Sequence, residues 1–180
     1  MEKKGASGVQ PSYNFILRML VGDIVEAVLK GVIKESGIEG YESSQKLSTQ
    51  LGKHTITGEA DLTFDGKVDD IKSCSDYAFR NKFVSWPSLK DRDSFGYVTQ
   101  LHVYASATGK PAGGIWALNV ATGELNRIES TDTDADVKDI LAEPDAVCVA
   151  NKVIAPPLIL DGNAVIFASE LLLARLIAID

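Results

Sequence analysis

The 180-residue chain contains very little cysteine. Its two cysteines, Cys74 and Cys148, lie far apart and form no Cys-x-x-Cys pair. A zinc ribbon or an iron–sulfur cluster held by four cysteines is therefore excluded. We expect both cysteines to be reduced thiols in a cytoplasmic protein.

Long apolar runs are also lacking. The start of the chain, MEKKGASGVQ, is polar and has no apolar core of the kind found in signal peptides. The most apolar stretch, residues 164–179, carries Glu170 and Arg175 and is too short to span a bilayer. We expect this stretch to form a helix buried by the rest of the domain or by a second copy of the chain, and we expect no membrane partner.

Positive charge is scarce, because 25 Asp and Glu residues outnumber 18 Lys and Arg residues and give a net charge of −7. This balance disfavours broad, nonspecific attraction to nucleic acid or to an anionic membrane. Basic and aromatic residues nevertheless alternate after residue 72, which is the composition of a nucleic-acid groove. A solvated loop over a small apolar cluster explains this segment equally well. The candidate DNA-binding residues are Arg80, Lys82, Lys90 and Arg92, and the interleaved aromatic residues are Tyr77, Phe79, Phe83 and Trp86.

What is present suits one folded domain, with apolar and charged fractions of 45% and 24%. Helical spacing predicts a first helix over 12–36, with Ser12 as its cap and Gly37 as its end. A strand from residue 53 and a hairpin within 59–72 would form a three-stranded meander. The other expected elements are a loop over 40–50, a variable segment over 73–93, a helix over 94–108, strands over 113–120 and 124–128, and helices towards the C-terminus. We predict an α/β or α+β layer of sheet packed by helices.

The hairpin is the most informative segment. Asp65-Gly66 lies between two short strand-like stretches and predicts a two-residue turn. Counting outward pairs Phe64 with Lys67 and, further along, Asp61 with Asp70. Because side chains alternate between the faces of a strand, one face would then carry a compact set of charges. The predicted members of that face are Glu59, Asp61, Val68, Asp70 and Lys72.

Two opposed carboxylates repel each other unless a cation lies between them. Oxygen ligands select Mg²⁺, Mn²⁺ or Ca²⁺ over zinc, and Mg²⁺ is commonly held by one or two carboxylates together with substrate phosphate oxygens. Lys72 could reach the scissile phosphate or the attacking water, so the pattern indicates phosphodiester hydrolysis. A plain Glu59–Lys72 ion pair with a solvated Asp61–Asp70 face is the alternative. A glycosidase needs carboxylates that are farther apart.

Three further polar residues are candidates on the two predicted helices. Glu26 stands at the edge of the apolar stripe of the first helix, where most glutamates are simply solvated. Gln100 and Tyr104 are four residues apart, so they project from the same side of the second helix, and Tyr97 joins them.

Taken together, these residues resemble the PD-(D/E)XK nuclease superfamily and, within it, the RecB-like and phage-type exonucleases. The matching elements are Glu26 on the first helix, Gly58-Glu59-Ala60-Asp61, Asp70-Ile71-Lys72 and the Gln-x-x-x-Tyr element Gln100-Leu101-His102-Val103-Tyr104. They also occur in the expected order and on the expected elements. The resemblance covers roughly residues 20–120. Ala60 stands where the superfamily name has proline, and neither iron–sulfur cysteines nor a helicase phosphate-binding loop is present.

The resemblance implies a restriction-endonuclease-like core with the order αβββαβ, in which a central mixed sheet is flanked by helices. It would form a single nuclease domain over 1–180, with a core over about 12–130 and a helical extension over about 131–180. It also implies that Asp61, Asp70, the Ile71 carbonyl and Glu26 bind Mg²⁺, or Mn²⁺ as a substitute. Lys72 would position or activate the attacking water, and Gln100 and Tyr104 would steady the site and the DNA strand.

The expected function is that of a Mg²⁺-dependent deoxyribonuclease, an exonuclease in bacterial or phage recombination, repair or DNA processing, located in the cytoplasm of a bacterial or phage-infected cell. An endonuclease of the same fold, and a catalytically silent DNA-binding or assembly protein, are the alternatives. DNA is the expected partner, together with further copies of the chain or a recombination subunit. Digestion polarity and strand preference are left open by the sequence.

Overall fold

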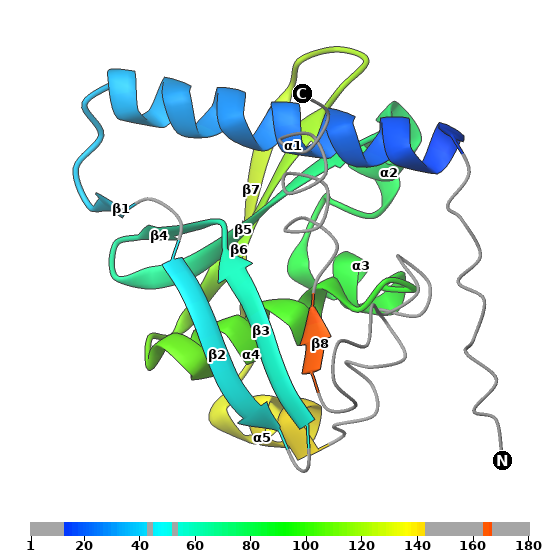
Figure 1. Ribbon diagram of the computed structural model, residues 1–180. Helices are drawn as coiled ribbons and strands as arrows, with labels where there is room; N and C mark the ends of the chain where they lie inside the picture. Colours follow the sequence, from blue (N-terminus) through cyan, green and yellow to red (C-terminus); the bar gives the residue numbers. More distant parts are fainter. Residues whose placement is uncertain (1–12, 43–44, 52–53, 143–163, 167–180) are drawn as a thin grey trace, which may run out of the picture.

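The computed structural model describes residues 13–42, 45–51, 54–142 and 164–166 (Figure 1). Its helices are α1 (Tyr13–Glu35), α2 (Asp76–Asn81), α3 (Trp86–Asp91), α4 (Tyr97–Thr108) and α5 (Asp134–Ala142). Its strands are β1 (Tyr41–Glu42), β2 (Gln45–Leu51), β3 (His54–Ala60), β4 (Leu62–Phe64), β5 (Lys67–Cys74), β6 (Ala112–Asn119), β7 (Leu125–Glu129) and β8 (Ala164–Ile166). Within these ranges, no helix is long and apolar enough to cross a membrane.

The strands form two sheets. The larger has five strands in the order β1-β4-β5-β6-β7, with β5 and β6 parallel and the other neighbours antiparallel. The smaller has the order β2-β3-β8, in which β2 and β3 are antiparallel and β8 runs parallel to β3. The predicted α+β class, with a central mixed sheet flanked by helices, is therefore confirmed.

Helices cover both faces of the five-stranded sheet, and alternation along its strands decides which residue faces which helix. α1 packs through Val25, Leu29 and Ile33 against a face that includes Leu62 and Ile71, and Figure 1 shows it lying across the strands. The opposite face packs against α4. That second cluster includes Val68, Cys74, Ile115 and Ala117 from the sheet and Val98, Leu101 and Ala105 from α4. Asp70 and Lys72 are an even number of positions away from Val68 and Cys74, so they share the face of β5 that lies on the α4 side.

The turn between β4 and β5 is the predicted one. Asp65 and Gly66 have φ angles of 50° and 73°, and two successive positive φ angles define the type I′ hairpin turn. Three predicted pairs are confirmed by the register, from Phe64 with Lys67 through Thr63 with Val68 to Leu62 with Asp69.

Beyond Leu62 the predicted register is wrong. Leu62 is the first residue of β4. The strand before it, β3, pairs with β2 instead of β5, which places Ala60 opposite Gln45 and Glu59 opposite Lys46. The predicted pairs of Asp61 with Asp70, Ala60 with Ile71 and Glu59 with Lys72 are therefore not formed. β3 and β2 are neighbours in the sequence and form a seven-residue antiparallel ladder, which outcompetes extension of the short β4.

Other local expectations also need correction. The presumed loop at 40–50 contains β1 and β2, the variable segment contains α2 and α3, and α4 begins at Tyr97 rather than at 94. Residues 164–166, expected in a helix, form β8 and extend the smaller sheet. The predicted cap Ser12, Cys148 and most of the predicted C-terminal helix lie outside the described residues.

The first helix ends as predicted, with Gly37 at a φ of 67° just beyond it. Only part of its apolar stripe is buried, however. Val25, Leu29 and Ile33 face the sheet, whereas another apolar row along the helix is 45–76% exposed. That row consists of Tyr13, Leu17, Val21, Ile24, Val28 and Val32.

Candidate nuclease site

Asp61 occupies the break between the two sheets. It is the single residue between β3 and β4, where the chain leaves one sheet for the other. Its Oδ2 accepts a hydrogen bond of 2.7 Å from the backbone N–H of Ile71, which takes the place of a backbone partner beyond the end of β4. The carboxylate of Asp61 is thus held beside β5 even though it belongs to no ladder pair.

Asp70 and Lys72 lie two residues apart on the α4 side of β5. The Lys72 ammonium donates to Asp70 Oδ1 at 2.9 Å and lies 2.7 Å from Oδ2. The Asp70 side chain is only 3% exposed, and its Oδ2, although ion-paired with the Lys72 ammonium, accepts no well-directed hydrogen bond from the described residues. This buried carboxylate therefore retains an oxygen that can accept another ligand.

α4 supplies the remaining predicted site residues. Lys72 Nζ also donates to Gln100 Oε1 at 3.3 Å, and Gln100 Nε2 donates to the Tyr104 hydroxyl at 3.1 Å. The ring of Tyr97 lies beneath the ammonium, with 5.1 Å between Lys72 Nζ and the ring centroid. One continuous chain of contacts thus runs from Asp70 on the sheet to Tyr104 on the helix.

The carboxyl groups carry an excess of negative charge. Burial, followed by repulsion from Asp70 and Glu26, raises the pKa of Asp61 well above its ordinary value despite the opposing attraction of Lys72. Burial and the charge of Glu26 likewise raise the pKa of Asp70, against the opposing effect of Lys72. Burial alone would lower the pKa of Lys72, but Asp70 and Asp61 outweigh it and raise that pKa. The site would therefore be stabilised by an additional cation.

Glu26 lies at the margin of this group. Its charge is close enough to affect both aspartates. Its Oε1, however, is paired with Lys30, which follows one turn later on α1. Strand alternation turns Asp70 towards α4, so Asp70 does not face α1 directly. A role for Glu26 in a metal site would therefore use its second carboxylate oxygen or a bridging water.

The donor set fits a hard divalent cation. Asp61 and Asp70 offer carboxylate oxygens, and the Ile71 carbonyl points to the same strand edge as its N–H, where Asp61 lies. In the described part of the chain, no three His, Cys, Asp or Glu side chains group together as a metal site. Two carboxylates are nevertheless enough for Mg²⁺, which keeps several waters and takes substrate oxygens as further ligands.

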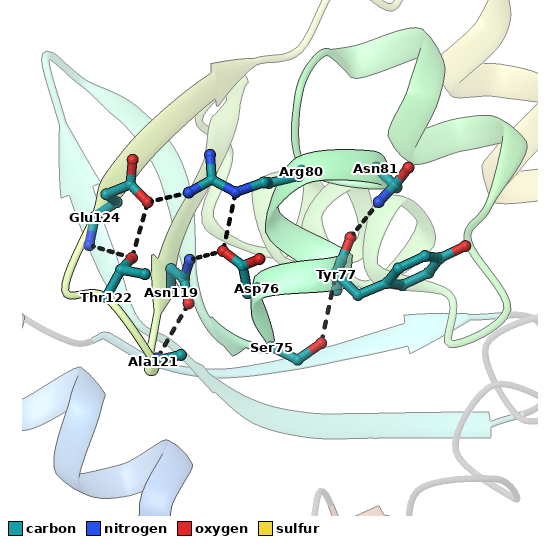
Figure 2. A network of polar contacts seen from close by, with 10 residues as sticks. Ser75, Asp76, Tyr77, Arg80, Asn81, Asn119, Ala121, Thr122 and Glu124 are labelled. Carbon is teal, nitrogen blue, oxygen red and sulfur yellow. Dashed lines mark hydrogen bonds and ion pairs between the residues drawn. The ribbon is translucent and has the colours of Figure 1, made fainter.

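The four predicted DNA-binding cations are not gathered at this site. Figure 2 shows Arg80 held between Asp76 and Glu124, at 3.0 and 2.7 Å, in a network at the start of α2. Lys90 pairs with Asp132 at 2.6 Å, and Arg92 is an exposed residue after α3. Only Lys82 lies near the site, because its ammonium is 4.3 Å from the centroid of the Tyr97 ring that also contacts Lys72.

Burial of the interleaved aromatic residues corrects the groove interpretation. Phe83 and Trp86 are each only 2% exposed and belong to the α4-side core, so neither can stack on a base. Phe79 packs against the same core, whereas Tyr77 is 73% exposed. The rings of Phe83 and Trp86 therefore serve the core, and of the four interleaved aromatic residues Tyr77 is the most exposed.

Sequence reasoning missed the surroundings of Lys82. Asp93 lies 3.5 Å from its ammonium and also accepts the N–H of Val98 in the first turn of α4. Phe95, 40% exposed, stacks on Tyr97 at a centroid distance of 5.6 Å. No spacing rule connects these residues, since the irregular segment between α3 and α4 positions them.

No family model matches the chain, and no curated protein matches it. Among solved structures, the chain is similar to one described as the crystal structure of SSO0001, at 19% identity and a TM-score of 0.42. The match covers 70% of this chain and 58% of the other, so the chain spans less than two thirds of that structure's length. A likeness of this size assigns neither a fold family nor a function.

Proposed function

We propose that the protein is a Mg²⁺-dependent deoxyribonuclease with a restriction-endonuclease-like core of the PD-(D/E)XK type. The observation that carries this proposal is the meeting of three separate sequence segments. Asp61, at the break between the sheets, accepts the N–H of Ile71, the β5 residue between Asp70 and Lys72, at 2.7 Å. Lys72 contacts Asp70 on β5 at 2.7–2.9 Å and Gln100 on α4 at 3.3 Å.

The residues that would hold the cation are Asp61, Asp70 and the Ile71 carbonyl. When bound there, Mg²⁺ supplies Lewis-acid stabilisation of the charge that develops on the phosphate and lowers the pKa of a water. Before binding, burial raises the pKa of both aspartates; repulsion from Asp70 adds to this at Asp61, and the charge of Glu26 adds to it at both. Their charges therefore favour uptake of a cation.

Lys72 would bind the scissile phosphate. An ammonium group has three donors, so Lys72 can hold Asp70 and Gln100 and still donate to a phosphate oxygen. Asp70 and Asp61 raise its pKa, which keeps the group protonated at neutral pH. The geometry therefore supports a role in positioning the phosphate and the attacking water and in stabilising negative charge.

Gln100 and Tyr104 would orient Lys72. The Gln100 amide accepts from the ammonium with its oxygen and donates to Tyr104 with its nitrogen, which fixes the amide orientation. Tyr104 is buried at 3% exposure, so it anchors the amide to the core. Removing either residue would leave Lys72 with more than one rotamer, and precise placement of a catalytic group contributes strongly to rate.

The proposed substrate is DNA, digested from its ends. The test is digestion of end-labelled linear DNA and of covalently closed circular DNA, in Mg²⁺ and in chelator. Wild type is compared with Lys72→Ala and with Lys67→Ala, a matched control because Lys67 is an exposed lysine at the start of the same strand. We expect wild type and Lys67→Ala to degrade only linear DNA in Mg²⁺, and Lys72→Ala to degrade neither substrate.

Each other result has a defined meaning. Cleavage of closed circular DNA into fragments would show that the protein is an endonuclease and not an exonuclease. Absence of cleavage by wild type in both Mg²⁺ and Mn²⁺ would overturn the nuclease proposal and favour a binding role. Equal activity of Lys72→Ala and wild type would remove Lys72 from the mechanism.

A further inference from the structure

Three aromatic rings form a ladder that leads away from Lys72 to the surface. Phe83 stacks on Tyr97 with centroids 6.2 Å apart and an interplanar angle of 24°, and Tyr97 stacks on Phe95 at 5.6 Å and 17°. Phe83 is buried at 2% exposure, whereas Phe95 is 40% exposed. The ladder therefore begins in the core, passes the candidate site at Tyr97 and ends in an accessible ring.

Lys82 fixes this ladder in place. Its ammonium lies 4.3, 5.2 and 5.7 Å from the ring centroids of Tyr97, Phe95 and Phe83, all within the range of cation–π attraction. Asp93 pairs with the same ammonium at 3.5 Å, a distance longer than a hydrogen bond. The ring of Phe95 is thus held near-parallel to Tyr97 by a buried cation rather than by a large apolar surface.

The ladder and the candidate site share the ring of Tyr97. Tyr97 is contacted by Lys72, at 5.1 Å from its centroid, and by Lys82. Tyr97 thus connects the ammonium proposed to bind the scissile phosphate with the ammonium that holds the ladder. A phosphate at Lys72 would place the adjoining part of its nucleotide strand near the exposed end of the ladder.

We propose that Phe95 is a stacking site for an unpaired base next to the scissile phosphate, so that the substrate enters the site as a single strand. This inference rests on the proposed nuclease function and deepens it by naming the strand form. An accessible ring with a fixed orientation suits this role, because every nucleobase has a face that can stack. A base inside a duplex could not use it, since both of its faces are already covered by its neighbours.

The experiment measures binding of a fluorescent 20-residue thymidine oligonucleotide by anisotropy in chelator, where no cleavage occurs. The variants are Phe95→Ala, Phe95→Trp and Tyr77→Ala. Tyr77 is a matched control because it is an aromatic residue on α2 with 73% exposure. We expect Phe95→Ala to weaken binding about tenfold, within the range known for loss of one base–aromatic stack. Phe95→Trp and Tyr77→Ala should bind as wild type does.

A single abasic nucleotide, moved along the oligonucleotide, separates stacking from a structural role. At one position it should weaken binding to wild type about as much as Phe95→Ala does, and it should have no further effect on Phe95→Ala. Equal affinities of wild type and Phe95→Ala, or abasic effects that are the same in both proteins at every position, would overturn the proposal.

Failure of the stacking site can be told apart from failure of the nuclease function by digestion of linear DNA with wild type in Mg²⁺. If digestion proceeds but Phe95 variants bind normally, or if wild type binds only blunt duplex, the stacking proposal falls and the nuclease proposal stands. If wild type neither digests nor binds DNA, both proposals fall.

Discussion

Asp69 and Asp70 are consecutive residues of β5 with almost the same burial, at 1% and 2% exposure, but their surroundings differ completely. Strand alternation turns Asp69 towards the α1 side of the sheet and Asp70 towards α4. The two residues share backbone, strand and residue type, so their comparison isolates the effect of the side chains around them.

Asp69 is fully satisfied. Arg127 donates to it from Nε at 2.7 Å and from Nη2 at 3.3 Å, and Trp116 Nε1 adds a third bond at 2.7 Å. Gly113 leaves room for this arrangement, because an added Cβ there would overlap Asp69 Oδ1. The group joins three strands of the sheet and has the character of a structural ion pair.

Asp70 is in the opposite condition. Its cation, Lys72, is shared with Asp61 and is also engaged by Gln100, and apart from the ion pair with Lys72 its Oδ2 accepts no hydrogen bond from the described residues. Negative charge from Asp61 and Glu26 accumulates on this side. Burial of an acid therefore does not by itself indicate function; the informative feature is charge that the surrounding protein leaves uncompensated.

Replacing each carboxylate by an amide should produce the largest difference between the two aspartates, and that difference should be in enzymatic activity. We expect Asp70→Asn to lower the initial rate of linear DNA digestion on the order of 10³-fold, because several kcal/mol of Lewis-acid stabilisation would be lost. Asp69→Asn should retain activity within a few fold at a temperature where circular dichroism shows it folded. Equal losses in the two variants would contradict the distinction.

Truncating the side chain of Asp69 to alanine should lower the stability of the protein, because Asp69 is part of a structural ion pair. Asp69→Ala would leave the Arg127 guanidinium and the Trp116 N–H without their acceptor, so we expect the free energy of unfolding in urea to fall by about 3 kcal/mol. Glu42→Ala is the control, since the Glu42–Lys110 pair is on the surface, with the Glu42 side chain 65% exposed, and should contribute less than about 1 kcal/mol. An Asp69→Ala variant as stable as wild type would show that the ion pair is dispensable.

Stabilisation of the protein by divalent cations should depend on Asp70 and not on Asp69. At a Mg²⁺ concentration about 100 times Kd, binding adds about 2.7 kcal/mol to the free energy of unfolding. We expect this gain in wild type and in Asp69→Asn, and its loss in Asp70→Asn. Thermal unfolding across a MgCl₂ titration, with matched ionic strength from NaCl, makes the measurement. A gain that persists in Asp70→Asn would move the cation to another site.

The parts of this site that the sequence predicts are those set by local spacing. The Asp65-Gly66 turn fixed the register of β4 against β5, and the four-residue spacing placed Gln100 and Tyr104 on one side of α4. Asp70 and Lys72 followed from strand alternation. These features depend on neighbours within a few residues, so they can be deduced without knowing the rest of the fold.

Nonlocal pairing decided the rest. Asp61 reaches the site through a break between two sheets, because β3 pairs with β2, whose polar sequence gave little sign of a strand. Lys82 was predicted to be one of four DNA-binding residues, yet it is buried among the rings of Phe83, Phe95 and Tyr97. Such placements depend on which distant segments pack together, and no single spacing in the chain encodes them.

The smallest expected effect tests the charge of Asp61 itself. Burial, followed by the charges of Asp70 and Glu26, raises its pKa in the folded state. A raised pKa contributes stability below the unfolded pKa of about 3.9, and that contribution is lost as pH rises through the folded value. In chelator at pH 7, Asp61→Asn should therefore be more stable than wild type by about 1 kcal/mol, since asparagine can still accept the Ile71 N–H.

This advantage of Asp61→Asn should shrink to nothing as pH approaches about 4, where the wild-type carboxyl becomes protonated in both states. Saturating Mg²⁺ should reverse its sign at pH 7, because the cation stabilises only the carboxylate. Urea unfolding at pH 4, 5.5 and 7, with chelator and with Mg²⁺, makes the comparison. If the variant were instead less stable than wild type at pH 7 in chelator, the charge of Asp61 would be compensated by the fold as that of Asp69 is, and the case for a cation between Asp61 and Asp70 would be lost.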